Sequence, residues 1–189
     1  MEEIRGATTG DQGITLLDGA NLKFVAGNGN DTITTGATGN QSITLGTGTN
    51  TVAAGGGTAC VTTSGGTNTI TGGAGALTVD AHYGNTTVVA GSGGSHVDLG
   101  FGATTVTGGN GADMIDVGLG RGVATFNNFT QGTDVIGVGH LGIHSYTELT
   151  AEATITISGS DTVITFDYGP TITLAGVASV TETDFSFGR

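Results

Sequence analysis

Two short segments of the sequence place a carboxylate at the end of a glycine-rich turn. They read AGNGNDTIT over residues 26–34 and GGNGADMID over residues 108–116, with Asp31 and Asp113 at the same place in each. Glycine allows the positive φ angles and close backbone contacts of such turns, which can aim carbonyl oxygens inward. Calcium prefers about six to eight hard oxygen ligands, and one carboxylate supplies negative charge. The two segments therefore predict calcium binding.

Both segments belong to a repeat with a period of nine residues. A branched aliphatic residue returns at this interval, apart from one ten-residue step: Ile33, Ile43, Val52, Val61, Ile70, Val79, Val88, Val97, Val106 and Ile115. A strand of about three residues buries one side chain, so the units must coil and stack until the aliphatic residues form a continuous column. The sequence predicts an all-β fold, a parallel β-roll (β-solenoid) with two nine-residue half-turns per coil.

The repeat resembles the nonapeptide Gly-Gly-x-Gly-x-Asp-x-U-x, with U aliphatic, of the repeats-in-toxin (RTX) family, which winds into a calcium-binding β-roll. In that family an ion lies between two turns stacked on the same edge, one coil apart. The resemblance implies that Asp31 shares an ion with the turn ending at Asn50, and Asp113 with the turn ending at Ser95. The implied calcium-site residues also include Gly27, Gly29, Gly109 and Gly111. Middle turns lack the carboxylate and are expected to be empty.

The nine-residue period stops after Gly122. Residues 154–158, 162–166 and 171–174 then alternate polar and apolar side chains, which is typical of strands. We expect them to form an antiparallel β cap that closes the roll, with a short helix near residues 145–150.

This C-terminal part resembles the domain that follows the repeats in serralysin-type proteases, alginate epimerases and other type I secreted proteins. The matching residues are Phe129, Gly132, Asp134, Ile136, Asp161, Thr162, Ile164, Phe166, Ile172, Leu174, Gly176 and Val177. The resemblance implies that Asp134 is a last calcium ligand. It also implies export by an ABC transporter that reads an uncleaved C-terminal signal, to the extracellular space or the cell surface.

Three segments follow from these patterns: residues 1–25, 26–122 and 123–189. The first is acidic and then apolar, and we expect it to form irregular first coils that cap the open end of the column. The alternative is that this end is left open for self-association. The second segment is the RTX-like roll, and the third is the capping and type I secretion domain.

One outward face of the roll is expected to be rich in threonine. Threonine precedes the aliphatic residue in every unit of this face, which gives a Thr-x-Thr array with spacings of about 4.8 Å and about 6.7 Å. That geometry resembles the ice-binding faces of β-solenoid antifreeze proteins. The residues are Thr32, Thr51, Thr69, Thr71, Thr87, Thr105 and Thr107. Binding of ice or of a polysaccharide through this face is therefore an alternative function.

The opposite face is expected to place Asp80, Asp98 and Asp116 in one column, about 4.8 Å apart. Like charges at this spacing are unfavourable unless protonation or a cation relieves them. A cation-binding stripe and a solvated acidic face both fit this pattern. His140 and His144 have the spacing of half a metal site on a helix, but glycines interrupt the segment and no third ligand is evident.

Composition narrows the classes of function. The net charge of −12 disfavours binding to nucleic acid or to an anionic membrane. No apolar run approaches the roughly 20 residues of a membrane span, and the single cysteine, Cys60, excludes an intramolecular disulfide. No catalytic arrangement of side chains stands out. We expect a secreted, non-enzymatic, calcium-binding β-roll that serves as a surface or matrix component or as the export module of a larger protein, with a self-assembling scaffold as a further alternative.

Overall fold

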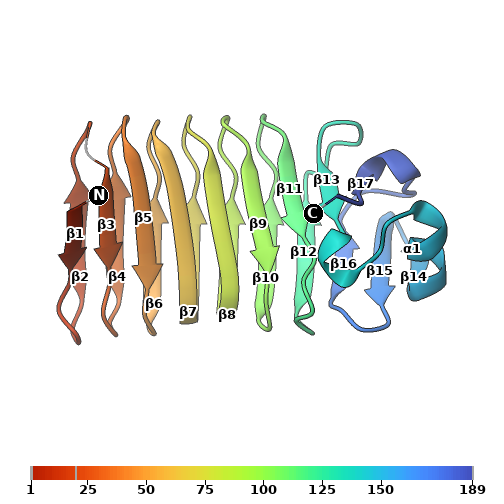
Figure 1. Ribbon diagram of the computed structural model, residues 1–189, viewed down its shortest axis with the longest axis horizontal. Coiled ribbons are helices and arrows are strands. Elements are labelled where there is room, and N and C mark those ends of the chain that lie inside the picture. Colours follow the sequence, from red (N-terminus) through yellow and green to blue (C-terminus); the bar gives the residue numbers. More distant parts are fainter. Residues whose placement is uncertain (1, 20, 189) are drawn as a thin grey trace.

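The chain winds into a β-solenoid of about eight turns, in which successive strands alternate between two parallel sheets (Figure 1). The computed structural model describes residues 2–19 and 21–188. Strands make up 53% of the chain and helices 7%. The expected all-β solenoid with some antiparallel strands near the C-terminus is confirmed.

The first sheet carries the Thr-x-Thr units. Its strands are β2 (Gln12–Leu16), β4 (Asp31–Thr35), β6 (Thr49–Ala53), the second halves of β7 (Thr58–Thr71) and β8 (Leu77–Val89), β10 (Ala103–Thr107), β12 (Val123–Asn127) and β16 (Thr171–Leu174). Neighbouring strands pair in parallel and in register, so Val52 lies beside Ile70, and Val88 beside Val106. These side chains are fully buried and form one half of the core.

The second sheet faces the first across the core. Its strands are β1 (Glu2–Arg5), β3 (Leu22–Val25), β5 (Asn40–Leu45), the first halves of β7 and β8, β9 (Ser95–Leu99), β11 (Asp113–Asp116), β13 (Val135–Gly137) and β17 (Phe185–Ser186). Val61, Val79 and Val97 lie in one stacked file, and each is completely buried. The nine-residue spacing therefore predicted the core column correctly.

Glycine turns let the coils stack closely at the corners. Gly48 has a φ of 118°, and a β-carbon on it would lie 2.1 Å from the carbonyl oxygen of Gly29 one coil below. A side chain is excluded there by both the backbone conformation and the space.

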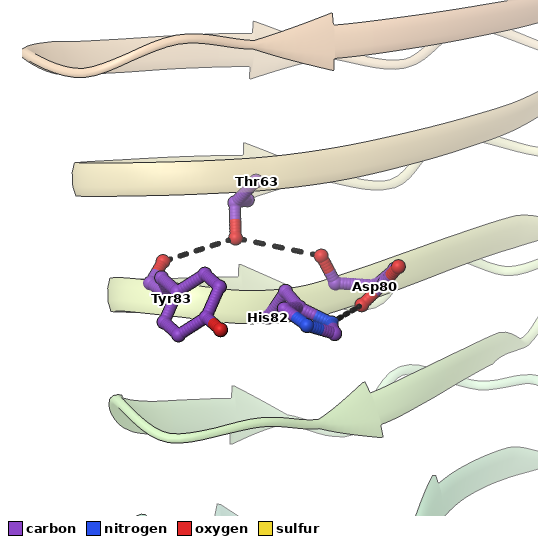
Figure 2. A network of polar contacts seen from close by, with 4 residues as sticks. All are labelled: Thr63, Asp80, His82 and Tyr83. Atoms are coloured by element: carbon purple, nitrogen blue, oxygen red, sulfur yellow. Dashed lines mark hydrogen bonds and ion pairs between the residues drawn. The ribbon is translucent and has the colours of Figure 1, made fainter.

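One corner is crossed by continuous strands. β7 and β8 bend from one sheet to the other, and their register shifts between Thr62 and Ser64 and again before Thr67. Thr63 is buried at this bulge, and its Oγ1 lies 3.4 Å from the carbonyl oxygen of Asp80 and 3.2 Å from that of Tyr83, within donating distance of both (Figure 2). The hydroxyl can thus donate its single proton to either of these two carbonyl groups at the bulge.

The coils extend farther toward the N-terminus than the repeat indicated. Ile14 lies beside Ile33, and Phe24 beside Ile43, in regular parallel pairing. Regular coils thus replace the irregular ones expected for residues 1–25, of which residues 1 and 20 lie outside the described chain. Within residues 2–19 and 21–188, β1 pairs only with β3 and β2 only with β4, so these two strands form the free end of the stack.

The stack also continues beyond Gly122, where the nine-residue period ends. β12 pairs with β10 and β13 with β11, after steps of 20 residues (106 to 126) and 21 residues (115 to 136). β14 (Ala153–Ser158), β15 (Asp161–Phe166) and β16 are antiparallel neighbours, as predicted, and β16 also pairs in parallel with β12. The cap is therefore hydrogen-bonded to the last coil.

Three short helices complete the C-terminal part. They are η1 (Gly139–Leu141), η2 (Glu182–Asp184) and α1 (Tyr146–Glu152). The Ser145 hydroxyl caps α1 by accepting a hydrogen bond from the Glu148 N–H. No helix in the described part of the chain is long and apolar enough to cross a bilayer.

Candidate functional site

A column of inward polar side chains runs along the corner where the chain enters the first sheet. Gln12 Nε2 donates to Asp31 Oδ1 at 3.2 Å, and the backbone N–H of Asp31 donates to Asn50 Oδ1 at 3.1 Å. Asn50 Nδ2 then donates to Asn68 Oδ1 at 3.0 Å. This ladder joins four successive coils, and its Asp31, Asn50 and Asn68 members are at least 99% buried.

One buried carboxylate oxygen in this column accepts no hydrogen bond from the described residues. Asp31 Oδ2 is buried and has no hydrogen-bond partner among residues 2–19 and 21–188. A buried carboxylate that lacks partners is unfavourable unless a proton or a cation satisfies it. The residues at this corner therefore fit a hard cation: an open carboxylate oxygen, a neighbouring amide oxygen and two stacked glycine turns.

The corner on the opposite edge, where the chain enters the second sheet, contains carboxylates whose oxygens all accept hydrogen bonds from the protein. Asp113 Oδ1 accepts from the N–H and the hydroxyl of Ser95, at 2.7 and 2.8 Å, and Asp113 Oδ2 accepts from the Gly109 N–H at 2.8 Å. Asp134 follows in the same column, and its two oxygens accept from the N–H groups of Asp113 and Thr130, at 2.9 and 2.8 Å. Every oxygen of the two carboxylates is satisfied by a protein donor.

The same surroundings shift the proton affinity of Asp134. Burial raises its pKa above the ordinary range, while the hydrogen bonds from the Thr130 and Asp113 N–H groups act in the opposite direction. The neighbouring Asp113 carboxylate also raises the pKa. The second corner thus contains two adjacent buried carboxylates that repel each other.

The residues expected to bind calcium fall into two groups on opposite edges. Gly27, Gly29, Asp31 and Asn50 lie at the first corner, and Gly109, Gly111, Asp113 and Asp134 at the second. The structure brings together both expected pairs, Asp31 with Asn50 and Asp113 with Ser95. Calcium binding stays a prediction at each corner. Of the three carboxylates at these two corners, only that of Asp31 has an oxygen without a partner among residues 2–19 and 21–188.

The predicted threonine array lies on the outer face of the first sheet. Thr51, Thr69 and Thr87 are neighbours in one column, and Thr71 lies in the second column of the same face. Thr32, Thr51, Thr69, Thr71 and Thr87 are exposed, and Thr105 and Thr107 are half-buried. Ala53 and Val89 interrupt the second column.

The predicted aspartate column lies on the outer face of the second sheet. Asp98 is directly beside both Asp80 and Asp116 on neighbouring strands. Burial raises the pKa of Asp98, His96 and His140 lower it, and Asp116 and Asp80 raise it further. The three aspartates line an open depression of about 260 Å³. The single cysteine, Cys60, is exposed on the same face.

Sequence reasoning missed the histidines beside this column. His82 and His96 were recognisable in principle, because each is two residues from an aspartate on its own strand, and side chains at i and i+2 share a face. His140 has no such signal, because it reaches Asp116 from η1.

No protein-family model and no curated protein matches this chain.

Proposed function

We propose that this protein is a secreted, non-enzymatic β-solenoid that binds calcium at the Asp31 corner and acts as a rigid component of a cell surface or extracellular matrix, or as the export module of a larger protein. The observation that carries the proposal is the buried oxygen of Asp31, which has no hydrogen-bond partner in the part of the chain that the structure describes. The C-terminal resemblance to type I secreted proteins supports the route of export.

The charge of the site would come from Asp31, and neutral oxygens would come from Asn50 and from the glycine turns around Gly27, Gly29 and Gly48. Because these turns stack directly on one another, an ion held between them would join two coils. Binding would then stabilise the stack locally. A single carboxylate favours weak affinity, with a Kd of about 10⁻⁴ to 10⁻³ M, which suits the calcium concentration outside cells.

Calorimetric titration with calcium tests this proposal in the wild type, in Asp31→Asn and in Asp113→Asn. The last variant is a control, because Asp113 has the same place in the repeat but lies at the opposite edge, where protein donors satisfy both of its oxygens. We expect saturable binding in the wild type, its loss in Asp31→Asn and its retention in Asp113→Asn. Absence of binding to the wild type at about 10 mM calcium, or full binding to Asp31→Asn, would overturn the proposal.

A second candidate function is supported by the threonine face. Its exposed Thr columns repeat at the sheet spacing of about 4.8 Å, which provides a regular array of hydroxyl and methyl groups for ice or polysaccharide. Thermal hysteresis and ice recrystallisation inhibition test the ice-binding form, with Thr69→Lys in the array and Ser42→Lys on the other face as control. Activity that is lost only in Thr69→Lys would support this function, and inactive wild-type protein would remove it.

A further inference from the structure

A histidine and two aspartates converge on the outer face of the second sheet. His96 Nε2 lies 3.5 Å from Asp98 Oδ1 and 3.5 Å from Asp116 Oδ2. One ligand atom from each side chain lies within 4.8 Å of the others. His96 and Asp98 come from β9, and Asp116 comes from β11, the next strand of the sheet. The group is therefore fixed by the pairing of two adjacent coils.

The imidazole nitrogen in this group has no hydrogen-bond partner. His96 Nε2 is buried, and neither carboxylate oxygen forms a hydrogen bond with it in the described part of the chain. Zinc binds imidazole nitrogen and carboxylate oxygen at about 2.0 to 2.2 Å, which puts two ligands of one tetrahedral ion about 3.3 to 3.6 Å apart. The observed separations of 3.5 Å fall in this range. Two of the three separations therefore match those around one ion, and the two carboxylate oxygens lie within 4.8 Å of each other.

We propose that His96, Asp98 and Asp116 form a binding site for a divalent first-row transition metal ion, with Zn²⁺ as the representative. One nitrogen and two carboxylate oxygens form a mixed ligand set that suits such ions, whereas calcium takes oxygen ligands alone. The site is distinct from the Asp31 corner in position and in ligand chemistry.

Electrostatics favours a cation at this place. Asp80, Asp98 and Asp116 are neighbours in one column, so the carboxylates repel one another across the strands. A divalent ion between Asp98 and Asp116 would offset this repulsion. Asp98 and Asp116 also line the depression beside the column, so water or an external group can approach an ion at these carboxylates and complete its coordination.

His140 and Gly137 flank one of the three proposed ligands, Asp116. His140 Nδ1 lies 3.5 Å from the second oxygen of Asp116. The remaining aspartate of the column, Asp80, is outside the proposed ligand set and has its own histidine, His82, whose Nδ1 lies 3.4 Å from Asp80 Oδ1 (Figure 2). Gly137 follows Asp116 in the column, and a β-carbon on it would lie 2.8 Å from Asp116 Oδ1. The glycine leaves room for the Asp116 carboxylate, and His140 is placed to orient it.

Titration with ZnCl₂, followed by calorimetry, tests the site in the full chain. We expect one Zn²⁺ per chain in the wild type, and an affinity at least tenfold lower in His96→Ala. His144→Ala is the matched control, because His144 is exposed and lies outside the cluster. Asp31→Asn should also leave zinc binding unchanged, which separates this proposal from calcium binding.

A cobalt absorption spectrum and a second cluster variant also test the site. Co²⁺ in place of Zn²⁺ should give the visible absorption of a low-symmetry site in the wild type and not in His96→Ala. Asp98→Asn, which removes a charge without loss of volume, provides a second variant should His96→Ala fold poorly by circular dichroism. Wild-type zinc affinity in both cluster variants, an equal loss in His144→Ala, or no binding to the wild type at 1:1 ratios in about 0.1 mM protein would overturn the proposal.

Discussion

Asp31 and Asp113 occupy the same position of the same repeat, yet their carboxylates meet opposite surroundings. Asp113 is enclosed by two backbone N–H groups and the hydroxyl of Ser95. Asp31 receives only the side-chain amide of Gln12, and its second oxygen has no partner in the described chain. One motif residue thus serves as an internal hydrogen-bond acceptor at one edge of the roll and remains open to a cation at the other.

The donors around each carboxylate decide between these two roles. Ser95, one coil before Asp113, offers its N–H and hydroxyl, and Gly109 of the same turn offers a second N–H. Gln12, one coil before Asp31, offers only its side-chain amide. Asn50, one coil after Asp31, presents its oxygen to the Asp31 N–H and its amide nitrogen to Asn68. The Asn50 amide group therefore donates to Asn68 and not to the Asp31 carboxylate. A glycine-rich turn with an aspartate is not sufficient to identify a calcium site, because donors from the same turn and from the adjacent coil can replace the ion.

The largest expected difference concerns stability without calcium. Asp113→Ala should lower the free energy of unfolding by about 3 to 5 kcal/mol, because buried N–H groups of Ser95 and Gly109 lose a charged acceptor. Asp31→Ala removes one hydrogen bond and one unsatisfied oxygen, and should lower it by about 1 kcal/mol or less. Urea unfolding in EDTA measures both. Equal losses would show that the two corners do not differ as described.

A second carboxylate at the first corner should make the stability of the folded protein depend on calcium. Asn50→Asp places two buried carboxylates side by side and breaks the bond to Asn68, which should lower the free energy of unfolding by about 2 kcal/mol in EDTA. Calcium should restore most of this loss. Asn68→Asp, one coil farther from Asp31, is the control and should recover less. A calcium-independent Asn50→Asp variant would contradict cation binding at this corner.

Calcium should stabilise the wild type modestly. At ten times the Kd, ligand binding adds about 1.4 kcal/mol to the free energy of unfolding, which corresponds to a rise in Tm of roughly 3 to 5 °C for a chain of this size. Thermal melts with calcium and with EDTA should show this rise in the wild type and in Asp113→Asn, but not in Asp31→Asn. A rise that depends on Asp113 instead would reverse the assignment of the two corners.

The smallest expected effect is a pH dependence at the second corner. The pKa of Asp134 is raised in the folded protein, mainly by burial, so the folded state holds this proton more tightly than the unfolded chain. Its stabilising contribution is present below the unfolded pKa of about 3.9 and is lost as pH rises through the folded pKa. Stability should therefore increase slightly from pH 7 toward pH 4, and by less in Asp134→Asn. An identical pH profile in the variant would contradict this origin.

The core of the fold could be predicted because it depends on a local pattern. Side chains such as Val61, Val79 and Val97 recur at the length of a half-coil, and no other arrangement buries all of them. Beyond Gly122 the pattern fails, because longer connections separate Val106 from Phe126 and Ile115 from Ile136. The parallel pairing of β16 with β12 also lies outside any local pattern, since it joins segments that are far apart in sequence.

The sites were predictable to a smaller extent. The spacing of one coil predicted that Asp31 lies beside Asn50 and Asp113 beside Ser95, and both contacts are present. The sequence could not show which carboxylate oxygen has a donor, because that depends on the direction of individual N–H groups in the same turn and in the neighbouring coil. The approach of His96 to Asp116 follows from strand alternation combined with register, whereas His140 reaches Asp116 through the conformation of η1 alone.

The alternation of the two sheets limits how the length of this protein can change. Deletion of eighteen residues from the regular part of the roll would remove one whole coil and leave threonine and aspartate on their own sides. Deletion of nine would move every later half-coil to the other side and mix the two surfaces. Gene duplication or loss in units of a complete coil can therefore lengthen or shorten the molecule while each surface keeps its chemistry.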